Sequence, residues 1–350
     1  MPSALDSRGL AWVKIPYIEH RMPGRLHYFL FRNPIAFLQA NWQFIQIVRR
    51  FRPTHIHACN PVFVLNFLLG MTVYRVPMVY RIGDEPTTHN WAWGLVWRFV
   101  GWRTSHFVAN SWFVGESLIK AGVSKDRMTI IYNAPPMSRA SVAPDLQVML
   151  GQQSIVIGYV GQLSEHKGVH VLIEAVARLT DKFPKVRLVI AGRISEWSGD
   201  AWARCLRDTA LADARIMDRI AFLGETDSAH GLLSRCAIHV VPSLFHDPAP
   251  NVVMEAKQAG CPSIVFPRGG LPELVADGVD GLVCREATAE CLAEALSTYL
   301  ENPALARKHG QAALESLERL RVPQFAQRWL DVYRNVAMSS RSVGNRWSWR

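Results

Sequence analysis

The 350-residue sequence lacks the features of a membrane-spanning, secreted or zinc-stabilised protein. No apolar run reaches the roughly 18 residues that a transmembrane helix needs. The nearest such run, Pro61–Tyr80, is interrupted by Asn66, Arg75 and Pro77. No basic segment followed by an apolar stretch opens the chain, so no secretory signal is expected. The six cysteines have no paired spacing, which disfavours disulfides or structural zinc. We therefore expect a cytoplasmic protein that is soluble or peripherally bound to a membrane.

Acidic residues are scarce in the first half of the chain. Lys and Arg outnumber Asp and Glu 39 to 29 overall, which gives a formal net charge of +10. Residues 1–150 carry 16 basic and 7 acidic side chains, a net of +9, whereas residues 151–350 carry 23 and 22, a net of +1. Seven of the 12 tryptophans also lie before residue 113. This balance indicates an anionic partner, either nucleic acid, a membrane surface or a phosphorylated substrate.

Short β-rich segments alternate with helical ones along the chain, which is typical of parallel sheets covered by helices. In the first half, strands are predicted at His55–Cys59, Pro77–Ile82, His106–Ala109 and Thr129–Tyr132, and helices at Pro34–Phe51, Asn90–Trp102 and Ser111–Ala121. In the second half, strands are predicted at Ile155–Val160, Val186–Ala191, Ile220–Leu223, Ile238–Val241 and Ser263–Phe266, and helices at Val169–Leu179, Ala201–Ala214, Gly231–Ser234 and Asn251–Ala259. A helix over Val322–Met338 precedes the basic tail Arg341–Arg350.

A segment rich in Pro, Ser and Ala interrupts this alternation, and we interpret residues 136–153 as an interdomain linker. The expected fold class is α/β, with two Rossmann-like parallel-sheet domains facing a cleft. A ligand would bind in that cleft, beside the carboxyl ends of the strands. The first domain would comprise residues 1–135 and the second residues 154–322.

One carboxylate does not suit an ordinary packed helix. In the predicted helix Asn251–Ala259, the stripe that faces the sheet contains Val252, Ala256 and Ala259, and Glu255 lies on that stripe. A carboxylate buried there costs several kcal/mol unless it is paired or reaches a polar cleft. The alternative is a helix-edge glutamate that extends to solvent.

The loop before this helix, Leu244–Pro250, contains Asp247 eight positions before Glu255. Pro250 suits the start of a helix, where its missing N–H costs nothing. The N–H groups of the first helical turn would then form an anion site. These N–H groups belong to Asn251, Val252 and Val253. Taken alone, Asp247 is also compatible with a capping or turn residue.

Two further loops follow predicted strands and suit an anion. Gly161–Gly168 leads into a helix, and its Lys167 opposes the helix dipole unless an anion binds beside it. Arg268–Glu273 contains the pair Gly269–Gly270, whose backbone N–H groups are unobstructed by side chains. The alternatives are a solvated lysine and a simple turn, because neither loop is a Walker loop or a dinucleotide fingerprint.

Together, these segments resemble the donor half of a GT-B-fold glycosyltransferase of family 4. The similarity is strong in residues 157–179 (IGYVGQLSEHKGVHVLIEAVARL) and 240–283, and weaker in residues 107–123 and 131–135. It covers most of residues 105–340. The resemblance implies an N-terminal acceptor domain, which looks shortened here, and a C-terminal helix in residues 323–350 that returns to it.

The resemblance also implies a reaction, namely transfer of a sugar from a UDP- or GDP-linked donor to a glycan or lipid-linked acceptor. Such a hexosyltransferase-type enzyme would act in envelope polysaccharide or glycolipid synthesis, with retention of anomeric configuration. No metal or other cofactor is implied, in agreement with the absence of an Asp-x-Asp motif. Lys167 would hold the diphosphate, Glu255 would accept hydrogen bonds from the ribose, and Asp247 replaces the first glutamate of the family's pair. The implied donor-binding residues are Gly161, Gln162, Asn251, Val252, Val253, Gly269 and Gly270.

Some positions depart from the family pattern. Gln162 stands where the family has a phosphate-binding arginine. The usual histidine of the N-terminal domain is missing from Arg81–Glu85, so Asp84 or His89 is the acceptor-side candidate. These departures leave open a non-catalytic or truncated sugar-nucleotide binder. A nucleic-acid binder is supported only by net charge, since no motif of that class is present.

The predicted helix Pro34–Phe51 has an apolar stripe and a basic end. The stripe consists of Leu38, Trp42, Ile45 and Val48, and the basic end consists of Arg49, Arg50 and Arg52. Two interpretations remain open. One is an ordinary packed helix with a solvated end, and the other is docking on the anionic inner face of a membrane.

Overall fold

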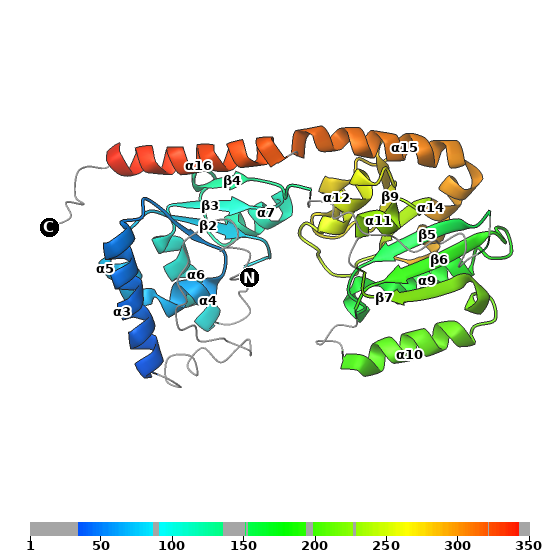
Figure 1. The fold of residues 1–350 in the computed structure, drawn as a ribbon, viewed down its shortest axis with the longest axis horizontal. Coiled ribbons are helices and arrows are strands. Elements are labelled where there is room, and N and C mark those ends of the chain that lie inside the picture. The colour runs from blue at the N-terminus through cyan, green and yellow to red at the C-terminus, as the bar shows by residue number, and fades with distance from the viewer. Residues whose placement is uncertain are drawn as a thin grey trace. The chain divides into compact units, whose positions relative to one another are not determined.

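The computed structural model describes residues 34–86, 91–135, 151, 153–193, 199–226, 229–320 and 322–342. The chain divides into two compact units (Figure 1). The first contains Met1–Asn110, Val114–Ile131 and Arg328–Arg350, and the second contains Ser111–Phe113 and Tyr132–Gln327. Nearly all of the predicted linker, residues 136–153, and most of the basic tail lie outside the described residues, so those domain boundaries stay predictions. Within the described residues, no helix combines the length and apolar character needed to cross a bilayer.

The first unit contains a four-stranded parallel sheet in the order β1-β2-β3-β4. Its strands are β1 (Ile56–Ala58), β2 (Met78–Ile82), β3 (His106–Ala109) and β4 (Met128–Ile130). The helices that belong with it are α3 (Pro34–Phe51), α4 (Pro61–Asn66), α5 (Leu68–Val73), α6 (Trp91–Arg103) and, from Val114 onward, α7 (Trp112–Lys120). Consecutive parallel strands require such helical crossovers.

The interrupted apolar run of the sequence forms core elements of the first unit. It supplies α4, α5 and β2, and its side chains Val64, Phe67, Met71 and Met78 are at most 1% exposed. Asn60 caps α4 by accepting a hydrogen bond from the N–H of Val62 at 2.8 Å. Much of the run is therefore buried in the core of the first unit, and its polar interruptions lie at or near the ends of these short elements.

The last described helix, α16 (Val322–Ser342), packs on β1 through its later residues. The ring of Trp329 lies 4.9 Å from that of His57, and the hydroxyl of Tyr333 lies 2.6 Å from His57 Nδ1. Burial, with a contribution from Arg81, lowers the pKa of His57. The segment from Arg328 onward thus completes the first unit although it comes last in the sequence.

The second unit contains a six-stranded parallel sheet in the order β10-β9-β8-β5-β6-β7. Its strands are β5 (Ile155–Val160), β6 (Val186–Ala191), β7 (Ile220–Gly224), β8 (Ile238–Val241), β9 (Ser263–Val265) and β10 (Gly281–Val283). The chain starts at β5, moves outward to β7, and then crosses back to β8 on the other side of β5. Ligands of open α/β sheets bind at such a reversal, outside the carboxyl ends of the two central strands.

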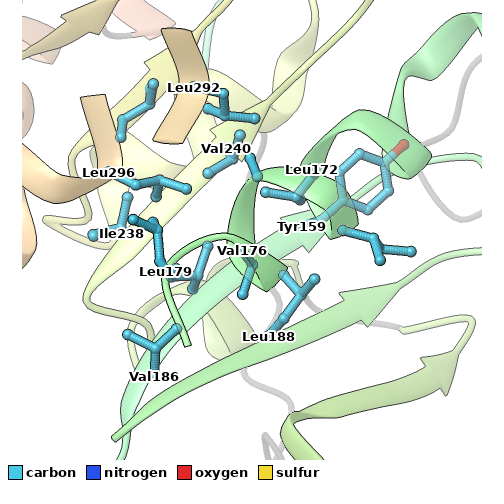
Figure 2. Packing of buried hydrophobic residues seen from close by; sticks show 14 of the residues in the cluster. Tyr159, Leu172, Val176, Leu179, Val186, Leu188, Ile238, Val240, Leu292 and Leu296 are labelled. Carbon is cyan, nitrogen blue, oxygen red and sulfur yellow. The ribbon is translucent and has the colours of Figure 1, made fainter. Parts of the chain in front are cut away.

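Helices cover both faces of this sheet and supply the core. They are α9 (Val169–Ala177), α10 (Gly199–Ala212), α11 (Ala229–Leu233), α12 (Asn251–Gln258), α13 (Leu271–Leu274), α14 (Ala289–Glu301) and α15 (Pro303–Ser316). Figure 2 shows Leu172 and Val176 of α9 beside Leu188 of β6, with Leu292 and Leu296 of α14 on the same core. Short 3-10 helices lie at Lys125–Arg127, Glu165–Lys167, Met217–Arg219 and Leu317–Leu320.

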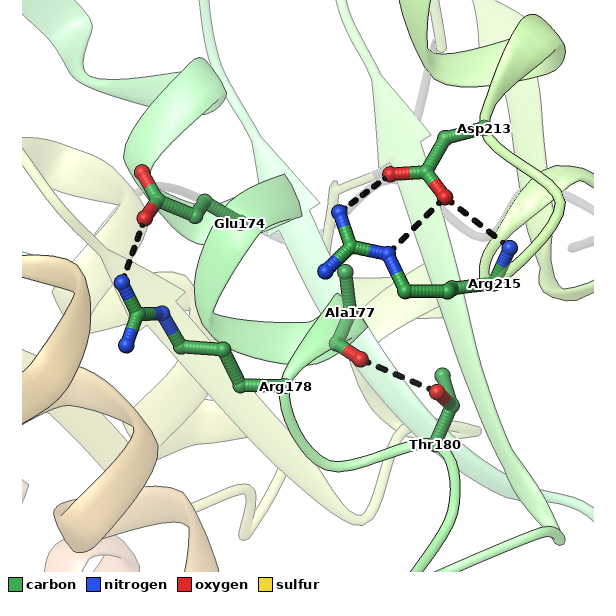
Figure 3. Close-up of polar contacts among 6 residues, drawn as sticks. All are labelled: Glu174, Ala177, Arg178, Thr180, Asp213 and Arg215. Atoms are coloured by element: carbon green, nitrogen blue, oxygen red, sulfur yellow. Dashed lines mark hydrogen bonds and ion pairs between the residues drawn. The ribbon is translucent and has the colours of Figure 1, made fainter.

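The end of α9 is held by surface polar contacts (Figure 3). Arg178 pairs with Glu174 at 2.7 Å and with Glu290 of α14 at 2.5 Å. The Thr180 hydroxyl donates to the carbonyl of Ala177 at 2.9 Å, which closes the last turn. These exposed ion pairs mark where α9 meets α14, whereas the buried residues of Figure 2 provide the main stabilisation.

Candidate functional site

Three loops meet at the carboxyl ends of the central strands in the second unit. Loop 161–168 follows β5, loop 242–250 follows β8, and loop 266–270 follows β9. The N–H groups of Leu244 and Phe245 donate to the carbonyl of His166 at 2.9 and 3.3 Å, and the N–H of Gly270 donates to the carbonyl of Asp247 at 2.8 Å. Because these bonds join backbone to backbone, the three loops form one rigid surface.

Glycines allow this close approach. Gly168 has φ +69°, and a Cβ added there would lie 1.9 Å from the carbonyl oxygen of Pro242. A Cβ on Gly270 would lie 1.9 Å from the carbonyl oxygen of Pro248. The N–H of Gly270 donates to the carbonyl of Asp247 in this structure, and the role of Gly270 in donor binding stays a prediction. Gly269 and Gly270 also let loop 266–270 pack against loop 242–250.

Lys167 and Asp247, predicted from separate motifs, form an ion pair. Lys167 Nζ lies 2.6 Å from Asp247 Oδ2 and 4.6 Å from the centre of the Phe245 ring. The two side chains are 22% and 8% exposed. Lys167 is therefore a partly buried, ion-paired cation at the reversal point and not a solvated surface lysine. An anion that reaches it competes with the carboxylate of Asp247.

Two of the three N–H groups predicted at the start of α12 have no acceptor among the described residues. Pro250 occupies the capping position, with φ −68° and ψ 123°. Val253 donates to the carbonyl of Pro250 at 3.3 Å, so its N–H is already used. Within the described part of the chain, the N–H groups of Asn251 and Val252 have no acceptor. These two donors, at the positive end of the helix dipole, suit an anion.

Glu255 is half-buried one turn further along α12. Burial raises the pKa of its carboxyl group, and His230 on α11 partly offsets this effect. No described residue donates a hydrogen bond to its carboxylate. A half-buried, unpaired carboxylate is costly, so Glu255 suits a ligand that brings hydroxyl donors.

The side chains of α12 that are buried differ from the stripe predicted to face the sheet. Val252 and Ala259 are only half-buried, whereas Val253, Met254 and Lys257 are buried together with Ala256. The reason is that α12 packs on β9 while α11 and α15 flank it. The buried Lys257 is paired with Asp280 at 2.5 Å and with the Ser316 hydroxyl at 3.0 Å. This ion pair stabilises the helix that carries Glu255.

The first part of loop 161–168 rests on the end of β6. The N–H of Gly161 donates to the carbonyl of Ala191 at 3.0 Å, and the role of Gly161 in donor binding stays a prediction. The carbonyl of Gln162 accepts a hydrogen bond from the Tyr159 hydroxyl at 2.7 Å. The neutral side chain of Gln162 is half-buried and brings no charge to the site. In this loop, Lys167 carries the positive charge at the reversal point.

Bracing residues that the sequence reasoning did not assign surround these loops. The carboxylate of Glu273 accepts the N–H groups of Trp112 and Phe113, both at 2.7 Å, and the Tyr132 hydroxyl at 2.9 Å. Asn133 Nδ2 donates to Asn251 Oδ1 at 2.9 Å and contacts the carbonyl of Ala249 at 3.4 Å. The Phe113 ring packs edge-on against His246 at 5.2 Å. All of these residues lie in the family-like stretches 107–123, 131–135 and 240–283. The family resemblance of these stretches was the sequence signal that could have identified them.

The acceptor-side candidates belong to the first unit. Asp84 is exposed in the turn after β2, where Asn110 Nδ2 donates to the carbonyl of Gly83 at 3.1 Å. His89 lies outside the described residues. Among the residues that are described, no three His, Cys, Asp or Glu side chains gather closely enough to hold a metal ion.

Two parallel-sheet units, the second with an anion-compatible reversal point, are the architecture of GT-B glycosyltransferases. Sequence comparison agrees with this class, because residues 148–316 match the profile of Glycosyl transferases group 1 and residues 10–139 match that of Glycosyltransferase Family 4. The chain belongs to glycosyltransferase family 4.

Individual relatives and structures are similar to this chain over most of its length. Glycogen synthase of Mycobacterium tuberculosis (strain ATCC 25618 / H37Rv) is 31% identical over 287 residues, which is 77% of this chain and 65% of that protein. Alpha-maltose-1-phosphate synthase of Mycolicibacterium smegmatis is 30% identical over 217 residues, which is 60% of this chain and 54% of that protein. The chain thus spans less than two thirds of the length of these relatives.

Among solved structures, Alr3699/HepE of Anabaena in complex with UDP superposes with a TM-score of 0.77 at 22% identity, covering 86% of this chain and 84% of that one. A glycosyltransferase from Rickettsia africae superposes with a TM-score of 0.75 at 16% identity, covering 96% and 87%. At these identities the likeness concerns the fold. The predicted architecture of two Rossmann-like parallel-sheet domains is confirmed.

Proposed function

We propose that this protein is a hexosyltransferase that moves a sugar from a nucleoside-diphosphate donor to a glycan or lipid-linked acceptor. One observation carries the proposal, namely that Lys167 pairs with Asp247 in the loop that leads into α12, while the first N–H groups of α12 and the carboxylate of Glu255 have no hydrogen-bond partner among the described residues. A diphosphate and a ribose complement these groups. The UDP and UDP-glucose complexes of Anabaena HepE support UDP as the nucleotide, with GDP as the other candidate.

In this reaction, the ammonium group of Lys167 leaves the carboxylate of Asp247 and pairs with an oxygen of the donor diphosphate. When the bond between the anomeric carbon and the diphosphate oxygen breaks, negative charge grows on the leaving group. Lys167 and the N–H groups of Asn251 and Val252 stabilise that charge. Glu255 accepts hydrogen bonds from the ribose hydroxyls, which orients the nucleotide. Asp247, released from the lysine, remains beside the sugar and phosphates.

The transfer retains the anomeric configuration and needs no metal or other cofactor in this proposal. The resemblance to family 4 supports retention. Lys167 and the helix N–H groups provide the charge stabilisation that a divalent cation provides in other enzymes. The product is an envelope polysaccharide or glycolipid, and Asp84 and His89 are the acceptor-side candidates. A lipid-linked acceptor would bring this cytoplasmic protein to the inner face of the membrane as a peripheral enzyme.

The test begins with a thermal-shift screen against UDP-, GDP- and ADP-sugars, followed by transfer assays with membrane extracts. Lys167→Ala should weaken donor binding about 10- to 150-fold, because hydrogen bonds to charged groups contribute about 1.5–3 kcal/mol. Glu255→Ala should abolish transfer while the fold persists. Lys182→Ala is a matched control, because Lys182 also pairs with a carboxylate, Glu301, and lies 5.3 Å from a phenylalanine ring, but precedes β6. Full transfer by both site variants would refute the proposal.

A second candidate function is a non-catalytic sugar-nucleotide binder. It is favoured by the neutral Gln162 and by the pairing of Lys167 with Asp247, which together reduce the positive charge available to a diphosphate. This alternative predicts donor binding in calorimetry without turnover in the presence of membrane extracts. Release of nucleotide together with transfer of labelled sugar would exclude it.

A further inference from the structure

Helix α3 presents apolar side chains on two sides. Its inward side contributes Phe37, Phe44 and Val48 to the core of the first unit, each at most 9% exposed. The outer side carries Ile35, Leu38 and Trp42, which are 68%, 58% and 62% exposed. The stripe expected from the sequence is therefore split, since Val48 packs inward while Leu38 and Trp42 face outward. Among the residues that the structure describes, packing within the first unit does not account for the outer side.

This outer side continues onto neighbouring elements through arginine–aromatic contacts. Arg49, two turns after Trp42 on α3, donates from Nε to the Tyr74 hydroxyl at 2.6 Å. The next residue along the chain, Arg75, lies over the Trp102 ring of α6 at 5.2 Å. Val73 at the end of α5 is 63% exposed, and Trp102 is 55% exposed. We name this surface the Arg–Trp patch, and its residues are Trp42, Arg49, Arg50, Val73, Arg75 and Trp102.

The outer face of α6 extends the patch. Trp91 and Leu95 are 80% and 53% exposed, and they share one helical face with the exposed Arg98 and with Trp102. From Pro34 to Gly115 the chain contains seven arginines and only two acidic residues, Asp84 and Glu85. Neither α3, α4, α5 nor α6 contains an acidic residue. The surface is therefore cationic, aromatic and aliphatic at once.

We propose that the Arg–Trp patch docks on an anionic phospholipid bilayer. Arginines attract acidic headgroups, tryptophan favours the interface between headgroups and acyl chains, and exposed aliphatic side chains gain by leaving water. A polynucleotide would use the arginines and aromatic rings, but aliphatic Leu38 and Val73 give it neither stacking nor hydrogen bonds. The inference rests on the proposed function insofar as a lipid-linked acceptor gives membrane docking a purpose.

Vesicle flotation tests the docking directly, without any sugar donor. The wild-type protein should float with vesicles of equimolar phosphatidylglycerol and phosphatidylcholine at low salt. It should float less at high salt, because screening weakens the attraction. Pure phosphatidylcholine vesicles should recruit it weakly. Absence of binding to the anionic vesicles at low salt would overturn the proposal.

Matched variants locate the contact on the patch. Arg50→Gln with Arg75→Gln should weaken binding about 25-fold, since each basic residue near an anionic surface contributes about fivefold. Arg307→Gln with Lys308→Gln removes the same charge from exposed positions of α15 in the second unit and should leave binding within about twofold. Trp42→Gln should weaken binding at low and high salt alike. Equal losses in both double variants would show a general charge effect and overturn the assignment to the patch.

Other occupants of the patch give distinct results. Sedimentation equilibrium that shows a dimer, converted to a monomer by Trp42→Gln, would assign the face to a second copy and overturn the proposal. Tighter binding of a generic oligonucleotide than of vesicles, lost in the Arg50→Gln, Arg75→Gln variant, would also overturn it. Donor thermal shifts monitored on the same variants keep the two proposals separate. A protein that transfers sugar to a soluble acceptor but never floats would retain the proposed function and lose this inference.

Discussion

Two glycines of the second unit allow a controlled test of how the candidate site is built. Gly168 and Gly278 both have φ +69°, so alanine meets the same left-handed backbone strain at each. Their surroundings differ, because a Cβ at Gly168 would lie 1.9 Å from the carbonyl oxygen of Pro242, whereas a Cβ at Gly278 would meet no atom within 4 Å. The pair therefore separates backbone strain from the contact between loops 161–168 and 242–250.

The magnitudes follow from this geometry. Gly278→Ala should cost about 1–2 kcal/mol of unfolding free energy from the left-handed conformation alone. Ordinary contact begins near 3.4 Å, so at Gly168 the backbone must shift by about 3.4 − 1.9 = 1.5 Å. Overpacking of this kind adds about 1–3 kcal/mol. Gly168→Ala should therefore cost about 2–5 kcal/mol.

Urea unfolding measures the stability difference, and calorimetry with the stabilising donor measures binding. Because Gly168 adjoins Lys167, its shift should displace the lysine and weaken donor binding at least tenfold, which corresponds to about 1.4 kcal/mol. Gly278→Ala should leave donor affinity within about twofold. Equal stabilities within about 0.5 kcal/mol, together with equal donor affinities, would refute the view that the loop contact sets the position of Lys167.

Three further predictions concern stability. Burial lowers the pKa of His239 from 6.5 to about 3. Below pH 6.5 His239 therefore binds a proton in the unfolded chain but not in the folded chain, so the unfolding free energy should fall as the pH drops toward 3. The contribution of His239 to the slope of unfolding free energy against pH reaches about 1.4 kcal/mol per pH unit. His239→Gln should lose this contribution, which urea unfolding between about pH 6.5 and 3 measures. Lys257→Met leaves the buried Asp280 without its cationic partner and should lower the unfolding free energy by about 3–5 kcal/mol, measured by thermal unfolding. Adding Asp280→Asn should recover most of this loss, and no recovery would contradict the pairing. Glu273→Ala removes an acceptor of three hydrogen bonds and should cost more than Tyr132→Phe, whose loss should be about 1 kcal/mol; the reverse order in urea unfolding would contradict the bracing role.

Much of the fold could be predicted because parallel strands buried on both faces appear as short apolar runs. The nine predicted strands agree with the observed ones within two residues, and Val186–Ala191 is one of four that agree at both ends, but β10 was not predicted. The prediction of Val322–Met338 was short by four residues at its end. Helices α4 and α5 were not predicted, because they lie in the interrupted apolar run Pro61–Tyr80, where no periodicity separates helix from strand.

The site was predicted less completely, because its geometry depends on strand order. Spacing and family resemblance singled out Lys167 and Asp247, but they are 80 positions apart and meet only because β5 lies beside β8. The sequence does not show that loop 242–250 supplies an acceptor for the N–H of Gly270. Glu273 was part of a quoted motif, yet its three donors come from positions more than 100 residues earlier.

The packing of α16 on β1 has a consequence for synthesis on the ribosome. The first unit takes its first segments from residues up to Ile131, but Trp329 and Tyr333 cover His57 only about 200 residues later. At a translation rate of about 5–20 residues per second, that interval lasts about 10–40 s. The second unit, nearly continuous in sequence, is complete before the first. The unit that is synthesised first is therefore the last to complete its fold. During that interval, one side of β1 in the nascent protein is not yet covered by α16.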